Sequence, residues 1–302
     1  MSSRPSPSNP DFTLRAMRIG VGLFYGLSRL MRRPTRPTGV VEHAYGAHPA
    51  ERLDAIPARP GSPSRRPVVF VHGGGWILGK KESYTPFLGF LAEAGYPVYN
   101  VEYPLAPENP HPGILLSLFR SLDWVRDQHP DLSGVHVMGD SAGGNLAMML
   151  GLMMSNPELV PAVDPARQEG LPLAADSVVS LYGVLDRLSW IEDGFPGAEN
   201  MLESYAGKPA FEASVDAELA VTPMDLDFSV APPTLLTCGT EDPLLRSSRL
   251  FAERLERGSG KVLLREYPGE GHGFFNLGRS QLAEQMNRDV LEFLDSEDPS
   301  SA

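Results

Sequence analysis

One serine of this sequence lies in a heptapeptide of small and polar residues, Gly139-Asp140-Ser141-Ala142-Gly143-Gly144-Asn145. The heptapeptide follows an apolar run, Val135–Met138, and opens a helical pattern over 142–155. Small residues beside a serine permit a sharp strand-to-helix turn, which holds the hydroxyl group clear of the backbone. The beginning of that helix would point free N–H groups at developing negative charge. The motif therefore predicts that Ser141 is a nucleophile.

A second glycine-rich loop, His72-Gly73-Gly74-Gly75-Trp76, follows the apolar run Val68–Val71. Successive glycines let backbone N–H groups turn toward an oxyanion with no side chain in the way. A flexible connection is the alternative interpretation, but flexibility alone requires neither a histidine before the glycines nor a tryptophan after them. We expect His72 to fix the loop rather than to take part in catalysis.

Two further loops supply an acid and a histidine. Asp242 lies in the loop Gly239–Leu244, and His272 lies in the loop Gly269–Phe274. Near neutral pH a serine hydroxyl group is a poor nucleophile, so His272 would remove its proton. Asp242 would fix the imidazole tautomer and stabilise the imidazolium ion. We therefore predict a catalytic triad in the chain order Ser141, Asp242, His272.

The elements between these loops alternate as in a parallel α/β sheet. A hairpin is predicted first, from Val40–Tyr45 and Arg52–Ile56. Loops at the carboxyl ends of such strands carry the chemistry. A polar stretch at about 186–227, rich in proline and glycine, interrupts the alternation and is interpreted as an insertion over that end of the sheet. The predicted strands are Val68–Val71, Val98–Val101, Val135–Met138, Ser177–Leu181, Thr234–Thr237 and Val262–Glu266, and the helices are at about 83–94, 113–128, 142–155, 245–257 and 280–294.

The motifs resemble those of the hormone-sensitive-lipase-like carboxylesterases, a group of the α/β-hydrolase superfamily. The resemblance runs from about Val40 onward and implies an α/β-hydrolase fold, with a mostly parallel sheet flanked by helices and a helical cap. It divides the chain into an arm and cap helix (1–40), a first core part (41–185), a cap insertion (186–227) and a second core part (228–302). The matching residues are His72–Trp76, Gly139–Asn145, Asp242-Pro243-Leu244 and His272-Gly273-Phe274.

The resemblance also implies a function and a site. Members of this group hydrolyse carboxylic esters through an acyl-enzyme, and we expect short- to medium-chain esters as substrates and no cofactor or metal. Pro243 and the family register favour Asp242 over Glu241 as the acid. Asp140 is expected to hold the sharp strand-to-helix turn at Ser141, which we call the elbow. The implied oxyanion hole comprises Gly73, Gly74, Gly75 and Ala142, in which Gly73 shapes the turn while the other three donate N–H groups. Trp76 and Phe274 are expected to line the substrate pocket or to pack under the cap.

Two alternatives remain at this point. An amide or lactone hydrolase of the same fold is one, because kynurenine formamidases carry a related His-Gly-Gly loop, although usually without the elbow sequence seen here. A ligand receptor is the other, since gibberellin receptors keep the oxyanion loop and the elbow serine. Those receptors lose the triad histidine, whereas His272 is present in its full motif.

Composition excludes several other classes of protein. The chain has 302 residues, of which 42% are hydrophobic and 21% charged, which is typical of a folded globular protein. Its net charge of −12 argues against nucleic acid as a partner. One cysteine, Cys238, cannot form an internal disulfide bond. No stretch of about 18 apolar residues occurs, and we expect a cytoplasmic enzyme with a small-molecule ester substrate.

The first 40 residues differ in charge from the rest, with seven arginines against one acidic residue. A helical pattern at 11–33 places arginines on one side and apolar residues on the other. This pattern could be a signal peptide, a peripheral membrane contact or a helix that lies over the body of the protein. We favour the last of these interpretations. Whether residues 11–33 form a lid, a membrane contact or a homodimer contact is left open.

Overall fold

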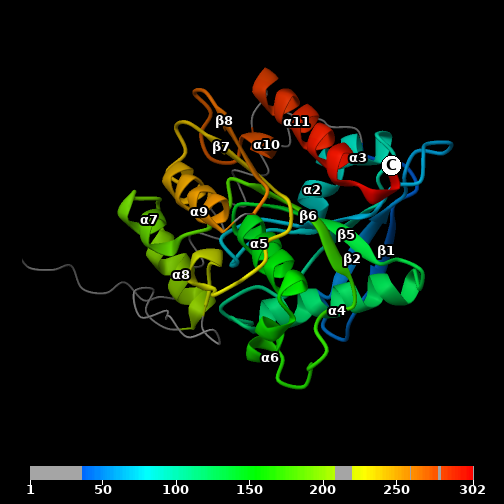
Figure 1. The fold of residues 1–302 in the computed structure, drawn as a ribbon, viewed down its shortest axis with the longest axis horizontal. Coiled ribbons are helices and arrows are strands. Elements are labelled where there is room, and N and C mark those ends of the chain that lie inside the picture. Colours follow the sequence, from blue (N-terminus) through cyan, green and yellow to red (C-terminus); the bar gives the residue numbers. More distant parts are fainter. Residues whose placement is uncertain (1–35, 208–219, 259, 278–279, 302) are drawn as a thin grey trace, which may run out of the picture.

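The computed structural model describes residues 36–207, 220–258, 260–277 and 280–301 and is built around one eight-stranded sheet (Figure 1). The strand order is β1-β2-β4-β3-β5-β6-β7-β8. The strands are β1 (Val41–Ala44), β2 (Arg52–Ile56), β3 (Val68–Val71), β4 (Val98–Val101), β5 (Gly134–Asp140), β6 (Ala174–Leu181), β7 (Thr234–Gly239) and β8 (Val262–Tyr267).

The sheet is parallel except at one edge. β1 pairs with β2 and β2 pairs with β4 in antiparallel register, whereas every later pair from β4 to β8 is parallel. The predicted hairpin is therefore confirmed, and so is the mostly parallel sheet. Parallel pairing brings the carboxyl ends of β3, β5, β6, β7 and β8 to one edge of the sheet.

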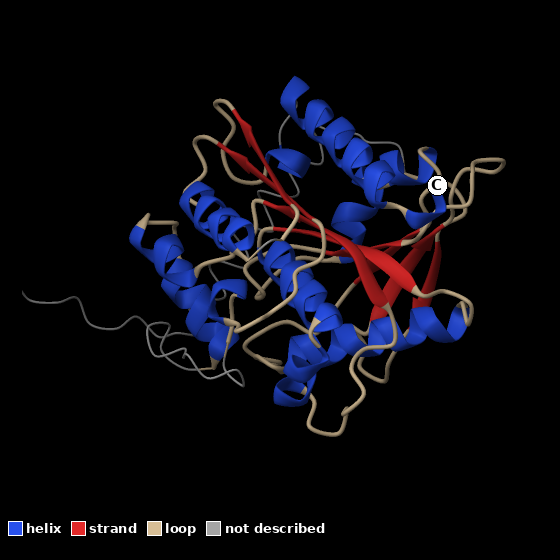
Figure 2. Ribbon diagram, in the orientation of Figure 1, coloured by secondary structure: helices blue, strands red, loops and turns tan. Residues whose placement is uncertain are grey.

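Helices cover both faces of the sheet, with α3 and α11 above it and α4 and α5 below it in the view of Figure 2. This arrangement accounts for the apolar strands, because β3, β4 and β5 are buried at every position. The helices are α2 (Lys81–Tyr84), α3 (Gly89–Glu93), α4 (Gly113–Gln128), α5 (Ala142–Ser155), α6 (Val160–Val163), α7 (Arg187–Glu192), α8 (Ala198–Ala206), α9 (Leu245–Arg257), α10 (Phe274–Leu277) and α11 (Gln281–Glu297); the short 3₁₀ turns are Thr85–Phe87, Pro157–Leu159, Pro223–Asp225 and Pro299–Ser301.

The helix α5, which the sequence predicts at the same bounds, forms the centre of the core. All of its residues except Ser155 are buried, and it packs against β5 and β6. A methionine-rich run, Met148 to Met154, fills the space there, as flexible apolar side chains do. The buried helix holds the turn between β5 and α5 in a fixed place relative to the sheet.

One predicted helix is divided in the structure. The expected helix at 83–94 becomes α2, a 3₁₀ turn over Thr85–Phe87, and α3. Pro86 is the reason, because a proline lacks the N–H group that a helix interior needs. The residues 157–163, which the sequence analysis assigned to no element, form a 3₁₀ turn and α6.

The stretch at 186–227 contains α7, α8 and the 3₁₀ turn Pro223–Asp225 among its described residues, and α7 contacts both α8 and α9. We call this stretch the inserted segment. The helix expected at 11–33 lies outside the described residues, as do residues 208–219 of the inserted segment. Within the described ranges, no single helix is long and apolar enough to cross a membrane; α5 and residues 157–163 meet the test only jointly, across a 114° bend.

Candidate active site

Ser141 occupies the turn between β5 and α5 with a backbone φ of +53° and ψ of −122°. Two glycines make this turn possible. A Cβ atom on Gly139 would lie 2.2 Å from the Gly143 carbonyl oxygen, and one on Gly143 would lie 2.1 Å from the Val71 carbonyl oxygen. The Ser141 N–H group donates to the Leu181 carbonyl group at 2.8 Å, which ties the turn to β6. The glycines of the motif therefore serve close backbone approach as well as the turn itself.

The structure brings the three predicted triad residues together in one hydrogen-bonded chain. His272 Nε2 lies 2.9 Å from Ser141 Oγ, and His272 Nδ1 lies 2.8 Å from Asp242 Oδ2. The other carboxylate oxygen, Asp242 Oδ1, accepts from the Leu244 N–H group at 2.9 Å. Asp242 is buried, whereas the His272 side chain keeps 23% of its surface exposed. With the proton on Nδ1 directed at the carboxylate, Nε2 can accept the serine proton.

The loop 72–76 follows β3 and turns back on itself at Gly74. The Gly74 carbonyl group accepts from the N–H groups of Ile77 and Leu78 at 3.2 and 3.1 Å. Gly74 has a φ of +123° and Gly75 a φ of +58°, which are conformations that glycine adopts readily. A Cβ atom on Gly74 would lie 2.1 Å from the Leu78 carbonyl oxygen, so no other residue fits without displacing the loop.

Asp140 connects this loop to the elbow. Its Oδ1 accepts from the Gly73 N–H group at 2.7 Å, and its Oδ2 accepts from the Tyr84 hydroxyl group at 3.1 Å. The Gly73 N–H group is thus directed at a carboxylate, which agrees with a turn-shaping role and leaves it no part as an oxyanion donor. Burial raises the pKa of Asp140 to about 7, although the two donors and the nearby His272 act in the opposite direction.

His72 is fully buried and lies behind the loop. Its ring stacks on Tyr103 with centroids 4.3 Å apart, and its Nδ1 lies 2.8 Å from the Gly73 carbonyl oxygen. The Tyr103 hydroxyl group donates to the His72 carbonyl group at 2.8 Å. These contacts fix the loop, which is the role expected for His72. Tyr103 belongs to the segment Tyr103–Glu108 that follows β4, so β4 helps to hold the loop on β3.

The two aromatic residues predicted at the substrate pocket contact other aromatic rings. Trp76 is fully buried between Tyr205 and Trp190. Phe274 is 3% exposed and lies against Tyr182 and Tyr267. The packing role, which the sequence left open for both, is therefore the one visible in the structure, and their contact with a substrate stays a prediction.

Two rings that the sequence analysis did not single out contact His272. The Tyr182 ring centroid lies 5.0 Å away and the Phe195 centroid 4.9 Å away, both edge-on. Tyr182 directly follows β6 at the carboxyl edge of the sheet, so its position was a usable signal. Phe195 belongs to the inserted segment between α7 and α8, and no feature of the sequence indicates its partner.

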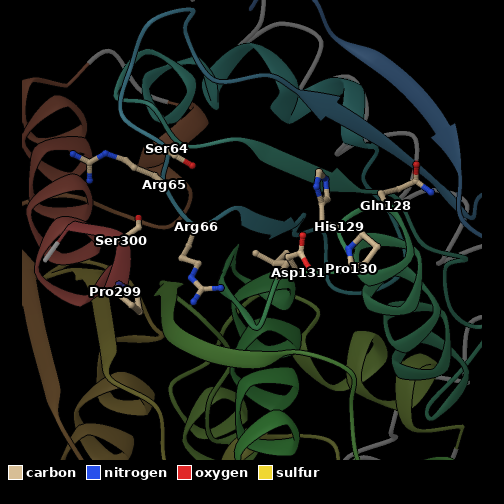
Figure 3. A pocket seen from close by; sticks show the side chains of 10 residues that line it. Ser64, Arg65, Arg66, Gln128, His129, Pro130, Asp131, Pro299 and Ser300 are labelled. Carbon is tan, nitrogen blue, oxygen red and sulfur yellow. The ribbon is translucent and has the colours of Figure 1, made fainter.

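A cavity of about 600 Å³ lies at the opposite, amino ends of β3 and β5 (Figure 3). The two arginines that line it are engaged with carboxylates. Arg65 points toward α11, where it pairs with Asp295, and Arg66 lies 3.7 Å from Asp176. Both arginines of the cavity are therefore paired with acidic side chains of β6 or α11. Among the described residues, no group of three or more His, Cys, Asp or Glu side chains is arranged to hold a metal ion.

Comparison with known proteins places these features in context. A family model described as alpha/beta hydrolase fold matches residues 68–276, which contain all three triad candidates. The chain is 29% identical over 244 residues to "Esterase LipC" of Mycobacterium tuberculosis, covering 76% of this chain and 58% of that protein. It is 30% identical over 238 residues to an esterase of Acinetobacter venetianus, covering 76% of this chain and 75% of the relative.

Solved structures show the same architecture. An esterase of Pyrobaculum calidifontis superposes with a TM-score of 0.77 at 24% identity, covering 97% of this chain and 95% of that one. At this identity the likeness concerns the fold. The chain spans only about three fifths of the length of LipC, so likeness to LipC covers part of that protein.

Proposed function

The chain belongs to the alpha/beta hydrolase family, and from that premise we propose that it is a serine carboxylesterase that hydrolyses short- to medium-chain esters through an acyl-enzyme. The observation that carries the proposal is the hydrogen-bonded chain from Ser141 Oγ through His272 to Asp242. The esterase names of its relatives support the same reaction class.

In the proposed mechanism Ser141 attacks the ester carbonyl carbon while His272 Nε2 takes the hydroxyl proton. The imidazolium ion is stabilised by Asp242, which is held in place by the Leu244 N–H group. His272 then protonates the departing alcohol, so the C–O bond breaks and an acyl-serine remains. Water attacks this acyl group with His272 again as the base, which releases the acid and restores Ser141.

The oxyanion is proposed to be held by the N–H groups of Gly74, Gly75 and Ala142. Gly74 and Gly75 precede Trp76 on the loop after β3, and Ala142 begins α5, whose positive dipole end favours an anion. Gly73 is not among the proposed donors, because its N–H group bonds to Asp140. Preorganised donors of this kind contribute about 3–4 kcal/mol each to lowering the barrier.

The inserted segment is proposed to act as a cap over the site. Its Phe195 ring contacts His272, and its Trp190 and Tyr205 rings contact Trp76. A cap in this position would limit the room for the acyl group, so short to medium acyl chains are proposed rather than long ones. The boundaries 186–227 and the contribution of the N-terminal arm stay predictions.

The proposal is tested by initial hydrolysis rates on p-nitrophenyl esters from acetate to palmitate, with wild-type protein and two variants. Ser141→Ala removes the nucleophile and should lower kcat on the order of 10⁶-fold. Ser64→Ala, which removes a hydroxyl group exposed at the other end of the sheet, should leave kcat unchanged. Rates that peak at short chains support the proposal.

Two results would count against it. Folded wild-type protein that hydrolyses no ester contradicts carboxylesterase activity and turns attention to amides, lactones or a receptor function. Equal ester hydrolysis by Ser141→Ala and wild type contradicts the serine mechanism while leaving esterase activity in place.

A further inference from the structure

Trp76 has an unusual backbone for a tryptophan. Its φ is +61°, a left-handed conformation that side chains with a Cβ atom rarely adopt. It directly follows Gly75, and its carbonyl group accepts from the Ala106 N–H group at 2.9 Å. A strained residue persists only where its surroundings hold it in place. The contacts of Trp76 therefore bear on the conformation of the glycine loop that precedes it.

Two rings of the inserted segment enclose the Trp76 side chain. Tyr205 of α8 stacks on it nearly parallel, with centroids 4.5 Å apart and an interplanar angle of 4°. Trp190 of α7 meets it edge-on, with centroids 5.8 Å apart and an angle of 77°. All three rings are at most 1% exposed. The buried Trp76 Nε1 has no hydrogen-bond partner among the described residues, so packing rather than a polar tether orients the ring.

The same face of α8 touches the glycine loop directly. Met201 lies one turn before Tyr205, and a Cβ atom on Gly75 would lie 2.4 Å from Met201 Sδ. Residues four apart on a helix share a face, so α8 covers Gly75 and Trp76 together. The loop is thus enclosed by α8 on one side and by the Asp140 carboxylate at Gly73 on the other.

Tyr205 is itself anchored to the core. Its carbonyl group accepts from the His111 N–H group at 2.7 Å, and its hydroxyl group lies 3.3 Å from His111 Nδ1. His111 is buried just before α4, which packs against α5. Tyr205 therefore links Trp76 to the core. A displacement of α8 would break the contacts of Tyr205 with both His111 and Trp76.

We propose that Tyr205 and Trp190 are positioning residues, which hold Trp76 in its left-handed conformation and thereby aim the Gly74 and Gly75 N–H groups at the oxyanion. This inference rests on the proposed esterase function. Oxyanion donors act only at about 2.7–3.1 Å from the developing charge. A misplacement of about 1 Å lowers rates on the order of 100-fold, while ground-state binding of the ester changes little.

The test compares Tyr205→Leu, which removes the stacked ring, with Tyr205→Phe, which keeps the ring and removes only the hydroxyl group. On p-nitrophenyl butyrate, Tyr205→Leu should lower kcat about 10- to 100-fold with KM within about twofold of wild type. Tyr205→Phe should stay within about threefold in both constants. Trp190→Leu, which removes the edge contact, should lower kcat by a smaller factor.

A second readout isolates the oxyanion. A trifluoromethyl ketone of similar chain length adds to the serine and places a negative oxygen in the same hole, so its Ki should rise by the factor by which kcat/KM falls. Phe251→Leu is the matched control. It removes a buried ring of α9 that lies tilted against Phe228 rather than against Trp76, so it should lower the thermal midpoint without changing kcat or Ki.

The outcomes separate the two proposals. If wild type hydrolyses the ester and Ser141→Ala does not, the esterase function stands. Unchanged kcat in folded Tyr205→Leu, or an equal loss in Phe251→Leu, then overturns the positioning role alone. Should Tyr205→Leu fail to fold, Trp190→Leu decides by the same split between kcat and KM. A wild type without ester turnover overturns the esterase function and the positioning role together.

Discussion

The two ends of the parallel sheet differ in how their loops are held. At the carboxyl ends, three residues other than glycine have positive φ among the described residues, namely Trp76, Ser141 and Tyr182, and each lies beyond the end of β3, β5 or β6. At the amino ends, a cavity is bordered by Arg65 and Arg66, which pair with carboxylates. The carboxyl ends therefore hold residues with strained backbones near the predicted triad. At the amino ends, by contrast, the two arginines are paired with carboxylates.

This difference suggests that the carboxyl ends of the sheet contribute mainly to turnover and the amino ends mainly to stability. Strain persists at the carboxyl ends because buried neighbours hold it, as α8 holds Trp76. At the amino ends, the ion pair of Arg65 with Asp295 attaches α11 to the segment before β3, and a hydrogen bond from the Arg66 backbone N–H group to Asp298 attaches the residues after α11. We therefore expect substitutions at the carboxyl ends to affect turnover first, and substitutions at the amino ends to affect stability first.

The largest effect that would sharpen this comparison is expected for Asp242→Asn. The amide keeps the size of the buried carboxylate but favours the wrong tautomer of His272, so kcat on a short-chain ester should fall about 10⁴-fold. The thermal midpoint should change by only a few degrees. Glu241→Gln is the control, because that neighbouring acid is exposed. A large loss of turnover in Glu241→Gln instead would transfer the acid role to Glu241.

A second comparison uses two glycines with positive φ. Gly74→Ala would place a Cβ atom 2.1 Å from the Leu78 carbonyl oxygen, so the loop must move, and kcat should fall about 10²- to 10³-fold. Gly61, which lies before β3 at the amino end, has a φ of +81°, and a Cβ atom there would meet no heavy atom of the described residues within 4 Å apart from its chain neighbours. Gly61→Ala should cost only about 1–2 kcal/mol of stability and leave kcat unchanged. Similar kinetics for the two variants would break the distinction between the ends.

A third comparison, of stability rather than turnover, is the pH dependence of the two ends. Burial raises the pKa of Asp140 to about 7, so the folded protein holds a proton that the unfolded chain loses above about pH 4. Burial lowers the pKa of His136 to about 4, against the pull of Asp298, so the unfolded chain binds a proton below about pH 6.5 that the folded protein refuses. The two groups therefore act on stability with opposite sign.

Urea unfolding at pH 4 to 8 measures this difference. Relative to Asp140→Asn, the unfolding free energy of wild type should fall as pH rises from about 4 to about 7, by up to about 4 kcal/mol. Relative to His136→Asn, it should fall as pH drops from about 6.5 to about 4, by up to about 3 kcal/mol. Equal slopes for both pairs, or slopes of the same sign, would contradict the assignment.

Much of the fold could be predicted because its signals are local. The helices α4, α5 and α9 have the bounds that their sequence patterns predict, and β2, β3 and β4 do as well. The helix expected at 83–94 differs from its prediction, because it contains Pro86 and is divided there. The elbow was predictable for the same reason, since its glycines, its strand and its helix are continuous in the sequence.

The types of the triad residues, their chain order and their places after β5, β7 and β8 could be predicted from the chain alone, because parallel strands bring those loops to one edge. Two contacts became visible only in the folded molecule: the Gly73 N–H group donates to Asp140, and the Trp76 ring stacks on Tyr205. The partners in these contacts are 67 and 129 residues apart in the chain. Their packing depends on how separate elements meet in space, which no local pattern of residues encodes.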